Sequence, residues 1–347
     1  MTLRRSRLGI SGVLGIPLFA SAAWLVAACG GSQPEAVGPS APTPVEVSPP
    51  PPEHAALPDA AAVGPAAPTP APEPPPPATV WRITEGVATP ESVLYDAAAD
   101  RYLVSNINGS PIDADNNGFI MEISGDGKIT KPKLVEGGAK AKLNAPKGLG
   151  LAGNVLYVAD INVVRKFDAK TGAAKGEIPI KDTTFLNDIA VAPDGRVFVS
   201  DSSVKPGEKG FEPLGGDAVY VIDKAGKVKT VAKSKDLKGP NGLIVVNDGV
   251  LVNQLVGDSI FRLDAEGAIK DVTKVPTGGL DGFLQIGDNL LVTSWEGSAV
   301  YRGKLNGKFE PVLSGLKGPA DMGYDSKRNR VVLPRFLDNA VEAYEIK

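Results

Sequence analysis

Six short turns in this chain each carry a polar side chain just before an apolar, strand-like run. The set comprises Glu91, Lys147, Asn187 with Asp188, Asn241, Asp281 and Asp321. Most members offer carboxylate or amide oxygens, the ligands of hard cations, so the set favours calcium, with magnesium, manganese or zinc as alternatives. The competing interpretation is that these are turn residues, because Asn and Asp side chains bond to their own backbone. Glu91 weakens that interpretation, since Glu is not a turn former.

Two residue counts exclude other kinds of site. The single histidine, His54, and the single cysteine, Cys29, both lie in the first 80 residues. The rest of the chain therefore cannot form a Ser-His-Asp triad, a cysteine nucleophile, a disulfide or a thiolate metal site. The net charge is only −3 and no basic stripe is present, so we expect no nucleic-acid partner.

The six polar positions belong to an internal repeat. Each copy reads as a turn, an apolar strand, a turn with Asp, Gly or Asn, and a second apolar strand, as in Gly239–Leu243 followed by Val250–Asn253. A third strand follows, for example Ser259–Leu263. Equivalent positions recur about 40 to 56 residues apart, which is typical of four-stranded propeller blades. Insertions at 106–118 and 204–216 lengthen the first and third copies.

The repeat predicts an all-β fold, a six-bladed β-propeller over residues 80–347. The sixth copy ends after its third strand, whereas Val80–Thr84 precedes the first copy and has no partner of its own. We expect this N-terminal strand to complete the last blade and close the ring. Because the loop before each innermost strand opens onto the central channel, the six polar positions should converge at one end of it.

The first 79 residues indicate export and tethering. Residues 1–28 have a basic start and an apolar run, and Val26-Ala27-Ala28-Cys29 resembles a lipoprotein signal, with cleavage before Cys29 and acylation of its thiol. A retained transmembrane helix and plain secretion are the alternatives. Residues 29–79 are rich in Pro and Ala, lack apolar residues for a core and predict a disordered linker.

This leader predicts a protein of the cell envelope, held on a membrane by its lipid anchor. Gly30 follows the cysteine in place of an aspartate that would favour inner-membrane retention. We therefore expect the outer membrane, facing the periplasm or the cell surface, and a monomer.

From about residue 89 to 346 the chain resembles the regucalcin/gluconolactonase-like six-bladed propellers, the senescence-marker-protein family, as a bacterial lipoprotein member. That family holds a divalent metal with Glu, two Asn and Asp from the first, third, fourth and fifth blades, and this pattern matches Glu91, Asn187, Asn241 and Asp281. The resemblance implies metal-dependent hydrolysis of a lactone or ester, with Asp281 as both ligand and catalytic base.

One departure concerns the substrate. Lactonases of the family carry an Arg, which holds sugar hydroxyls, at the position of Phe185. Lys147 either replaces that cation or neutralises Glu91 or Asp321. The substrate-pocket candidates are Lys147, Phe185, Asp188, Trp295, Asp321 and Arg335. For Trp295 the alternative is packing between blades, and for Arg335 it is a surface salt bridge.

Two further hypotheses stay open at this point. Asp113–Gly118 resembles the first half of an EF-hand calcium loop, but the twelfth position is Ser124 instead of Glu, which favours a polar insertion at the channel rim. The main alternative to an enzyme is a non-catalytic propeller that binds a ligand or protein partner at the cell envelope. A strictosidine-synthase-like or electron-transfer role is a third possibility.

Overall fold

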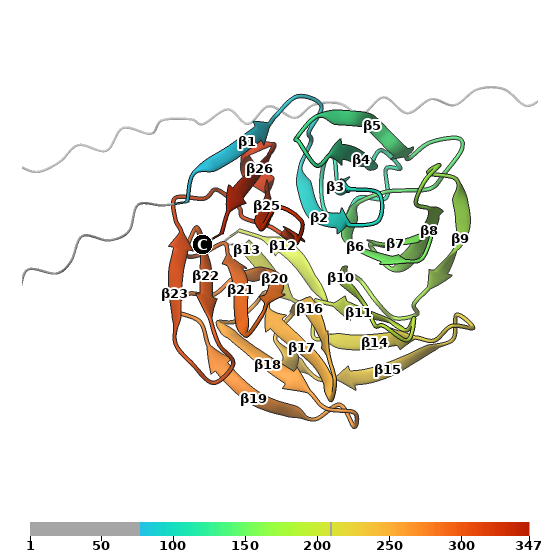
Figure 1. Cartoon of the computed structure of the whole chain (residues 1–347). Helices are drawn as coiled ribbons and strands as arrows, with labels where there is room; N and C mark the ends of the chain where they lie inside the picture. Colours follow the sequence, from blue (N-terminus) through green and yellow to red (C-terminus); the bar gives the residue numbers. More distant parts are fainter. Residues whose placement is uncertain (1–76, 209, 347) are drawn as a thin grey trace, which may run out of the picture. The chain divides into compact units, whose positions relative to one another are not determined.

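Apolar runs separated by Gly, Asp and Asn turns fold into six four-stranded antiparallel sheets arranged around a central axis (Figure 1). The computed structural model describes residues 77–208 and 210–346. The predicted signal peptide, Cys29 and all but the last three residues of the predicted linker lie outside the described residues. The prediction of an all-β, six-bladed propeller is confirmed.

The sheets follow one another along the chain. The first three blades are β2 (Pro90–Asp96), β3 (Arg101–Asn106), β4 (Phe119–Ser124) and β5 (Ile129–Glu136); β6 (Pro146–Ala152), β7 (Val155–Asp160), β8 (Val163–Asp168) and β9 (Ala174–Pro179); and β10 (Leu186–Val191), β11 (Val197–Asp201), β14 (Ala218–Ile222) and β15 (Val228–Lys233). The next two are β16 (Pro240–Val246), β17 (Gly249–Gln254), β18 (Ser259–Leu263) and β19 (Ile269–Lys274); and β20 (Leu280–Ile286), β21 (Asn289–Ser294), β22 (Ala299–Gly303) and β23 (Phe309–Leu313).

The sixth blade combines both ends of the described chain. It contains β24 (Gly323–Asp325), β25 (Arg330–Arg335), β26 (Ala340–Glu345) and β1 (Thr79–Ile83). In β1, Arg82 pairs with Glu342 and Ile83 with Val341 of β26. The predicted closure by an N-terminal strand is therefore confirmed, and it removes a free sheet edge.

Four of the described elements lie outside this pattern. The insertion in the third blade forms a hairpin of β12 (Val204–Gly207) and β13 (Gly210–Pro213), which the sequence repeat does not predict. Two short 3-10 helices are η1 (Lys235–Leu237) and η2 (Phe336–Asp338). Among residues 77–208 and 210–346, no helix has the length and apolarity needed to cross a membrane.

The core is divided among the blade interfaces. In the part of the chain that the structure describes, one apolar cluster lies between each pair of neighbouring blades, the last joining the sixth blade to the first through Ile83, Tyr102 and Val341. Inner strands such as β2 are buried on both faces, whereas outer strands such as β9 are largely exposed. Burial at these interfaces, at about 25 cal/mol per Å² of apolar surface, fixes the inner strands around the axis.

Candidate functional site

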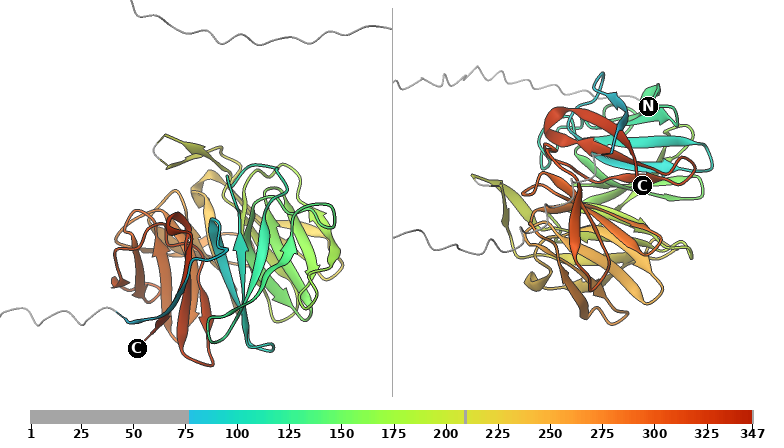
Figure 2. Two further views of the ribbon diagram at one scale, coloured as in Figure 1. Left: turned by 90° about the horizontal axis from the view of Figure 1, so that it is seen from above. Right: turned by 60° about the vertical axis from the view of Figure 1, so that its left-hand side comes forward.

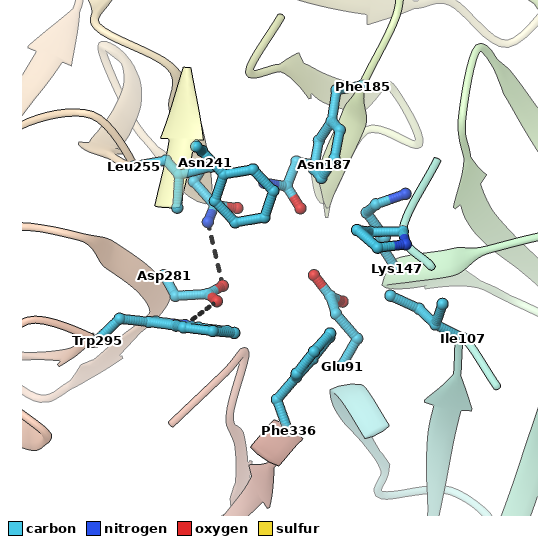
Figure 3. A pocket seen from close by; sticks show the side chains of 12 residues that line it. Glu91, Ile107, Lys147, Phe185, Asn187, Asn241, Leu255, Asp281, Trp295 and Phe336 are labelled. Atoms are coloured by element: carbon cyan, nitrogen blue, oxygen red, sulfur yellow. Dashed lines mark hydrogen bonds between the residues drawn. The ribbon is translucent and has the colours of Figure 1, made fainter. Parts of the chain in front are cut away.

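The four predicted metal ligands converge at one end of the channel. Glu91, Asn187, Asn241 and Asp281 come from four different blades and line one pocket. Figure 3 shows the Glu91 and Asp281 carboxylates and the Asn187 amide grouped around a common space. All four residues are buried.

A shared backbone irregularity directs these side chains into the channel. In the first five blades, the ladder between the two innermost strands shifts register between the first and fourth residues of the inner strand, as between Pro90 and Val93 or Leu280 and Phe283. Such a bulge frees the intervening residues from regular pairing and re-aims their side chains. Glu91, Asn187, Asn241 and Asp281 each occupy the second position of an inner strand, inside this irregularity.

Glycine lets the inner strands approach each other at this level. A Cβ on Gly242 would lie 2.5 Å from the carbonyl oxygen of Asp281, and one on Gly282 would lie 2.7 Å from Ala320 O. Both contacts are with backbone, which cannot move aside cheaply. The glycines after Asn241 and Asp281 therefore bring neighbouring blades, and the donors they carry, close together.

Glu91 is the least satisfied of the four donors. Its Oε2 atom is buried and has no hydrogen-bond partner among the described residues. Burial, and then the nearby Asp281 and Asp321 carboxylates, raise the pKa of Glu91 well above its usual value, while Lys147 opposes the shift. A buried carboxylate oxygen without a donor is costly unless a cation or a proton compensates it.

The two amides are held by hydrogen bonds from their nitrogen atoms. Asn187 Nδ2 donates to Ser202 Oγ at 2.9 Å. Asn241 Nδ2 donates to Asp281 Oδ1 at 3.1 Å and to Leu280 O at 3.3 Å. With each nitrogen directed at a protein acceptor, the amide oxygen is the atom left to face a cation.

Asp281 is fixed by donors at both carboxylate oxygens. Oδ1 accepts from Asn241, and Oδ2 accepts from Trp295 Nε1 at 2.7 Å. Burial raises the pKa of Asp281 to about 7, even though these two hydrogen bonds oppose the shift. The carboxyl can therefore exchange a proton near neutral pH in the absence of a cation.

Lys147 is buried beside these donors and contacts Phe185, the residue found where the lactonases carry Arg. Its Nζ donates to Ala145 O at 3.1 Å and lies 4.5 Å from the centre of the Phe185 ring. Burial lowers the pKa of Lys147 to about 8, although Glu91 opposes this. The ammonium thus offsets negative charge in the ring of donors while Phe185 covers it.

Three predicted pocket residues lie elsewhere. Asp188 and Asp321 line a second hollow, among residues further along the inner strands. Burial raises the pKa of Asp188 to about 6. Arg335 is absent from the residues lining the donor pocket, and its guanidinium pairs with Glu342 and Asp338, each at 2.8 Å. Its guanidinium is thus engaged by ion pairs within its own blade and by a hydrogen bond to Gly315 O. Lys147, Phe185 and Trp295 do line the donor pocket.

Most of the pocket wall was not predicted. Above the donors lie Ile107, Pro111, Phe211, Leu255, Trp295 and Phe336, here called the apolar collar. Of these only Trp295 was a candidate. Four of the six directly follow the second strand of their blades, at the ends of β3, β17, β21 and β25. This recurrence, an apolar residue just after a polar strand end, is the signal that could have identified them.

The EF-hand-like segment forms part of the connection between β3 and β4. Asp115 Oδ2 accepts from Asn117 Nδ2 at 2.6 Å, and Asn116 Oδ1 accepts from Leu143 N at 2.8 Å. Its polar side chains thus hold the loop itself. Across residues 77–208 and 210–346, no three His, Cys, Asp or Glu side chains are grouped as they would be around a metal.

The donor pocket nevertheless fits a hard divalent cation, because its set combines two carboxylates with two amides. A cation would bind the unpaired Oε2 of Glu91. It would also bind the amide oxygens of Asn187 and Asn241, whose nitrogens already donate to protein acceptors. All donors are oxygen, which suits calcium or magnesium better than soft metals.

The structure therefore defines a six-bladed propeller with a ring of oxygen donors at one end of its channel. The sequence matches no protein-family model, and no curated protein is significantly similar to it. Among solved structures, it is similar to a gluconolactonase from Xanthomonas campestris (TM-score 0.57, 19% identity, covering 79% of this chain and 96% of that one).

Two further structures show the same likeness. One is provisionally described as a gluconolactonase (TM-score 0.53, 17% identity, 78% and 89% covered). The other is virginiamycin B lyase from Staphylococcus aureus (TM-score 0.53, 16% identity, 77% and 99% covered). At these identities the likeness establishes the propeller fold that this chain shares with gluconolactonase-like proteins.

Proposed function

We propose that this protein is a divalent-metal-dependent hydrolase of lactones or esters. The observation that carries the proposal is the unpaired, buried Oε2 of Glu91 within a ring of four oxygen donors. The gluconolactonase among the structural neighbours supports the same reaction class. Bound there, a divalent cation would polarise the substrate carbonyl and make a nearby water more acidic.

The chain's own residues supply the remaining steps. Asp281, oriented by Asn241 and Trp295, accepts a proton from water as the water oxygen bonds to the carbonyl carbon. The ring C–O bond of the lactone, or the ester bond, then breaks, and the same proton passes from Asp281 to the departing alkoxide oxygen. Lys147 stabilises negative charge nearby without leaving its place on the Phe185 ring.

The test uses the full-length protein with calcium, magnesium, manganese or zinc and a panel of glucono-δ-lactone, δ-decalactone and phenyl acetate. We expect turnover that a chelator removes and that the metal restores. Asp281→Asn should lower kcat by about 10² to 10⁴ and abolish metal-induced thermal stabilisation. Asp288→Asn is the matched control, because the Asp288 side chain is 88% exposed.

Two results would count against the proposal. Turnover that is unchanged by the chelator and by Asp281→Asn would place the chemistry elsewhere. Metal-induced stabilisation without turnover on any substrate would instead favour a binding protein of the cell envelope.

A further inference from the structure

The walls of the donor pocket differ in chemistry from its floor. Every polar side chain that lines it is one of the four donors, Lys147, or Trp295, whose only N–H donor is committed to Asp281. The collar and Phe185 supply the remaining lining side chains, all of them apolar.

The collar is a built feature of the fold. Five blades contribute to it through the connection after the second strand, whereas in the second blade β7 and β8 are joined by Ile161 and Asn162 alone. Two aromatic pairs reinforce it. The rings of Phe185 and Phe211 pack edge-on with their centroids 5.5 Å apart, and the ring centroids of Trp295 and Phe336 are 5.2 Å apart. Figure 3 shows Phe185 on one side of the donors and Trp295 with Phe336 on the other.

The one cationic side chain among the described residues that line the pocket, Lys147, is itself buried and already engaged. Lys147 is 1% exposed, donates to Ala145 O and faces the Phe185 ring. A polyhydroxylated lactone would leave several of its hydroxyls without partners against the collar, and unpaired buried hydroxyls are unfavourable. An alkyl or aryl group would instead replace water along the same wall.

We infer that the substrate is a lactone or ester with an apolar body, alkyl or aryl, whose carbonyl reaches the donors while its body lies against the collar. That the bound molecule is also hydrolysed rests on the proposed function. The preference for binding an apolar molecule rests only on the residues that line the pocket. It predicts that kcat/KM for δ-decalactone exceeds kcat/KM for glucono-δ-lactone by a factor of about 10² or more. The two lactones have the same ring size.

The experiment measures hydrolysis and binding separately on the full-length protein. Hydrolysis of both lactones is followed by proton release. Binding is followed as displacement of the fluorescent apolar probe N-phenyl-1-naphthylamine, which needs no turnover. Phe336→Ala removes a collar ring, and Leu337→Ala is its matched control, because adjacent Leu337 is 62% exposed.

Displacement by δ-decalactone that Phe336→Ala weakens about tenfold, with Leu337→Ala unchanged, supports the inference. If that pattern appears without hydrolysis of either lactone, the proposed function fails and the apolar pocket stands. Equal or better hydrolysis of glucono-δ-lactone overturns the inference, as does displacement that both variants weaken equally or that does not occur.

Discussion

At the scale of single residues, Trp295 connects the apolar collar of the pocket to the four oxygen donors. Its ring belongs to the collar, while its Nε1 donates to Asp281 Oδ2 at 2.7 Å. Groups that orient a metal ligand in this way commonly contribute 10- to 100-fold to metal affinity. The tryptophan therefore has two roles that a substitution can separate.

Trp295→Phe keeps most of the apolar ring and removes only the N–H. We expect calcium affinity, measured by titrating thermal stability, to fall about tenfold. Trp81→Phe is the control, because Trp81 Nε1 has no hydrogen-bond partner among the described residues. An unchanged calcium affinity in Trp295→Phe would show that the hydrogen bond does not support the site.

At the scale of elements, the sequence repeat was sufficient for the blades. Apolar runs such as Leu251–Asn253 and the turns around them recur at blade spacing, so strand order and ring closure follow from local pattern. The polar second position of four inner strands could also be predicted, because Glu91, Asn187, Asn241 and Asp281 stand in register in the sequence repeat.

The rest of the site depends on contacts that no local pattern contains. The hairpin β12–β13 lies in an insertion that the sequence repeat does not describe, so Phe211 could not be placed at the pocket. Arg335 is a pocket candidate because its position in the sixth blade resembles that of Trp295 in the fifth, but ion pairs with Glu342 and Asp338 hold it. A salt bridge was the alternative that the sequence left open for Arg335, but the choice of carboxylates, and the burial of the pair with Glu342, depend on the fold.

The pairing of β1 with β26 should make stability depend on pH. Glu342 of β26 is buried and pairs with Arg335 and with Arg82 of β1. Burial raises the pKa of this carboxyl, but the hydrogen bond from Tyr344 and the two arginine charges outweigh burial and hold the pKa below its usual value. The carboxylate therefore stabilises the fold above the unfolded-state pKa of about 4.5, and this contribution is lost as pH falls through the folded-state pKa.

Thermal unfolding of wild type and Glu342→Gln between pH 7 and pH 3 tests this dependence. Wild type should lose Tm below about pH 4.5, and the variant should start lower and lose less across the same interval. Parallel curves for the two proteins would show that Glu342 is not the group responsible.

For the whole molecule, closure of the ring concentrates stability at one strand. Ile83 of β1 packs in the cluster that joins the sixth blade to the first. Deleting Thr79–Ile83 exposes the edge of β26 and opens that cluster, so we expect loss of cooperative unfolding by circular dichroism. Ile83→Ala is the milder change, with an expected loss of about 2–4 kcal/mol. A deletion variant with the wild-type Tm would mean that β1 does not close the ring.

The described chain also has a polarity along its axis. β1 begins at Thr79, paired with Tyr344, at the end of the sixth blade opposite η2, and Phe336 of η2 lines the donor pocket. Figure 2 shows β1 entering at one end of the propeller and the β12–β13 hairpin at the other. The start of β1 and the candidate site therefore lie at opposite ends of the propeller.

We propose that Cys29 carries a lipid anchor that holds the protein on a membrane. Cys29→Ser removes the only thiol of the chain and should move the protein from the membrane pellet to the soluble envelope fraction. Because Cys29→Ser changes none of the four donors, calcium-induced stabilisation of the released protein should equal that of the anchored form in detergent. A Cys29→Ser protein that stays in the pellet would contradict acylation and favour the retained apolar segment of residues 8–28 as the anchor.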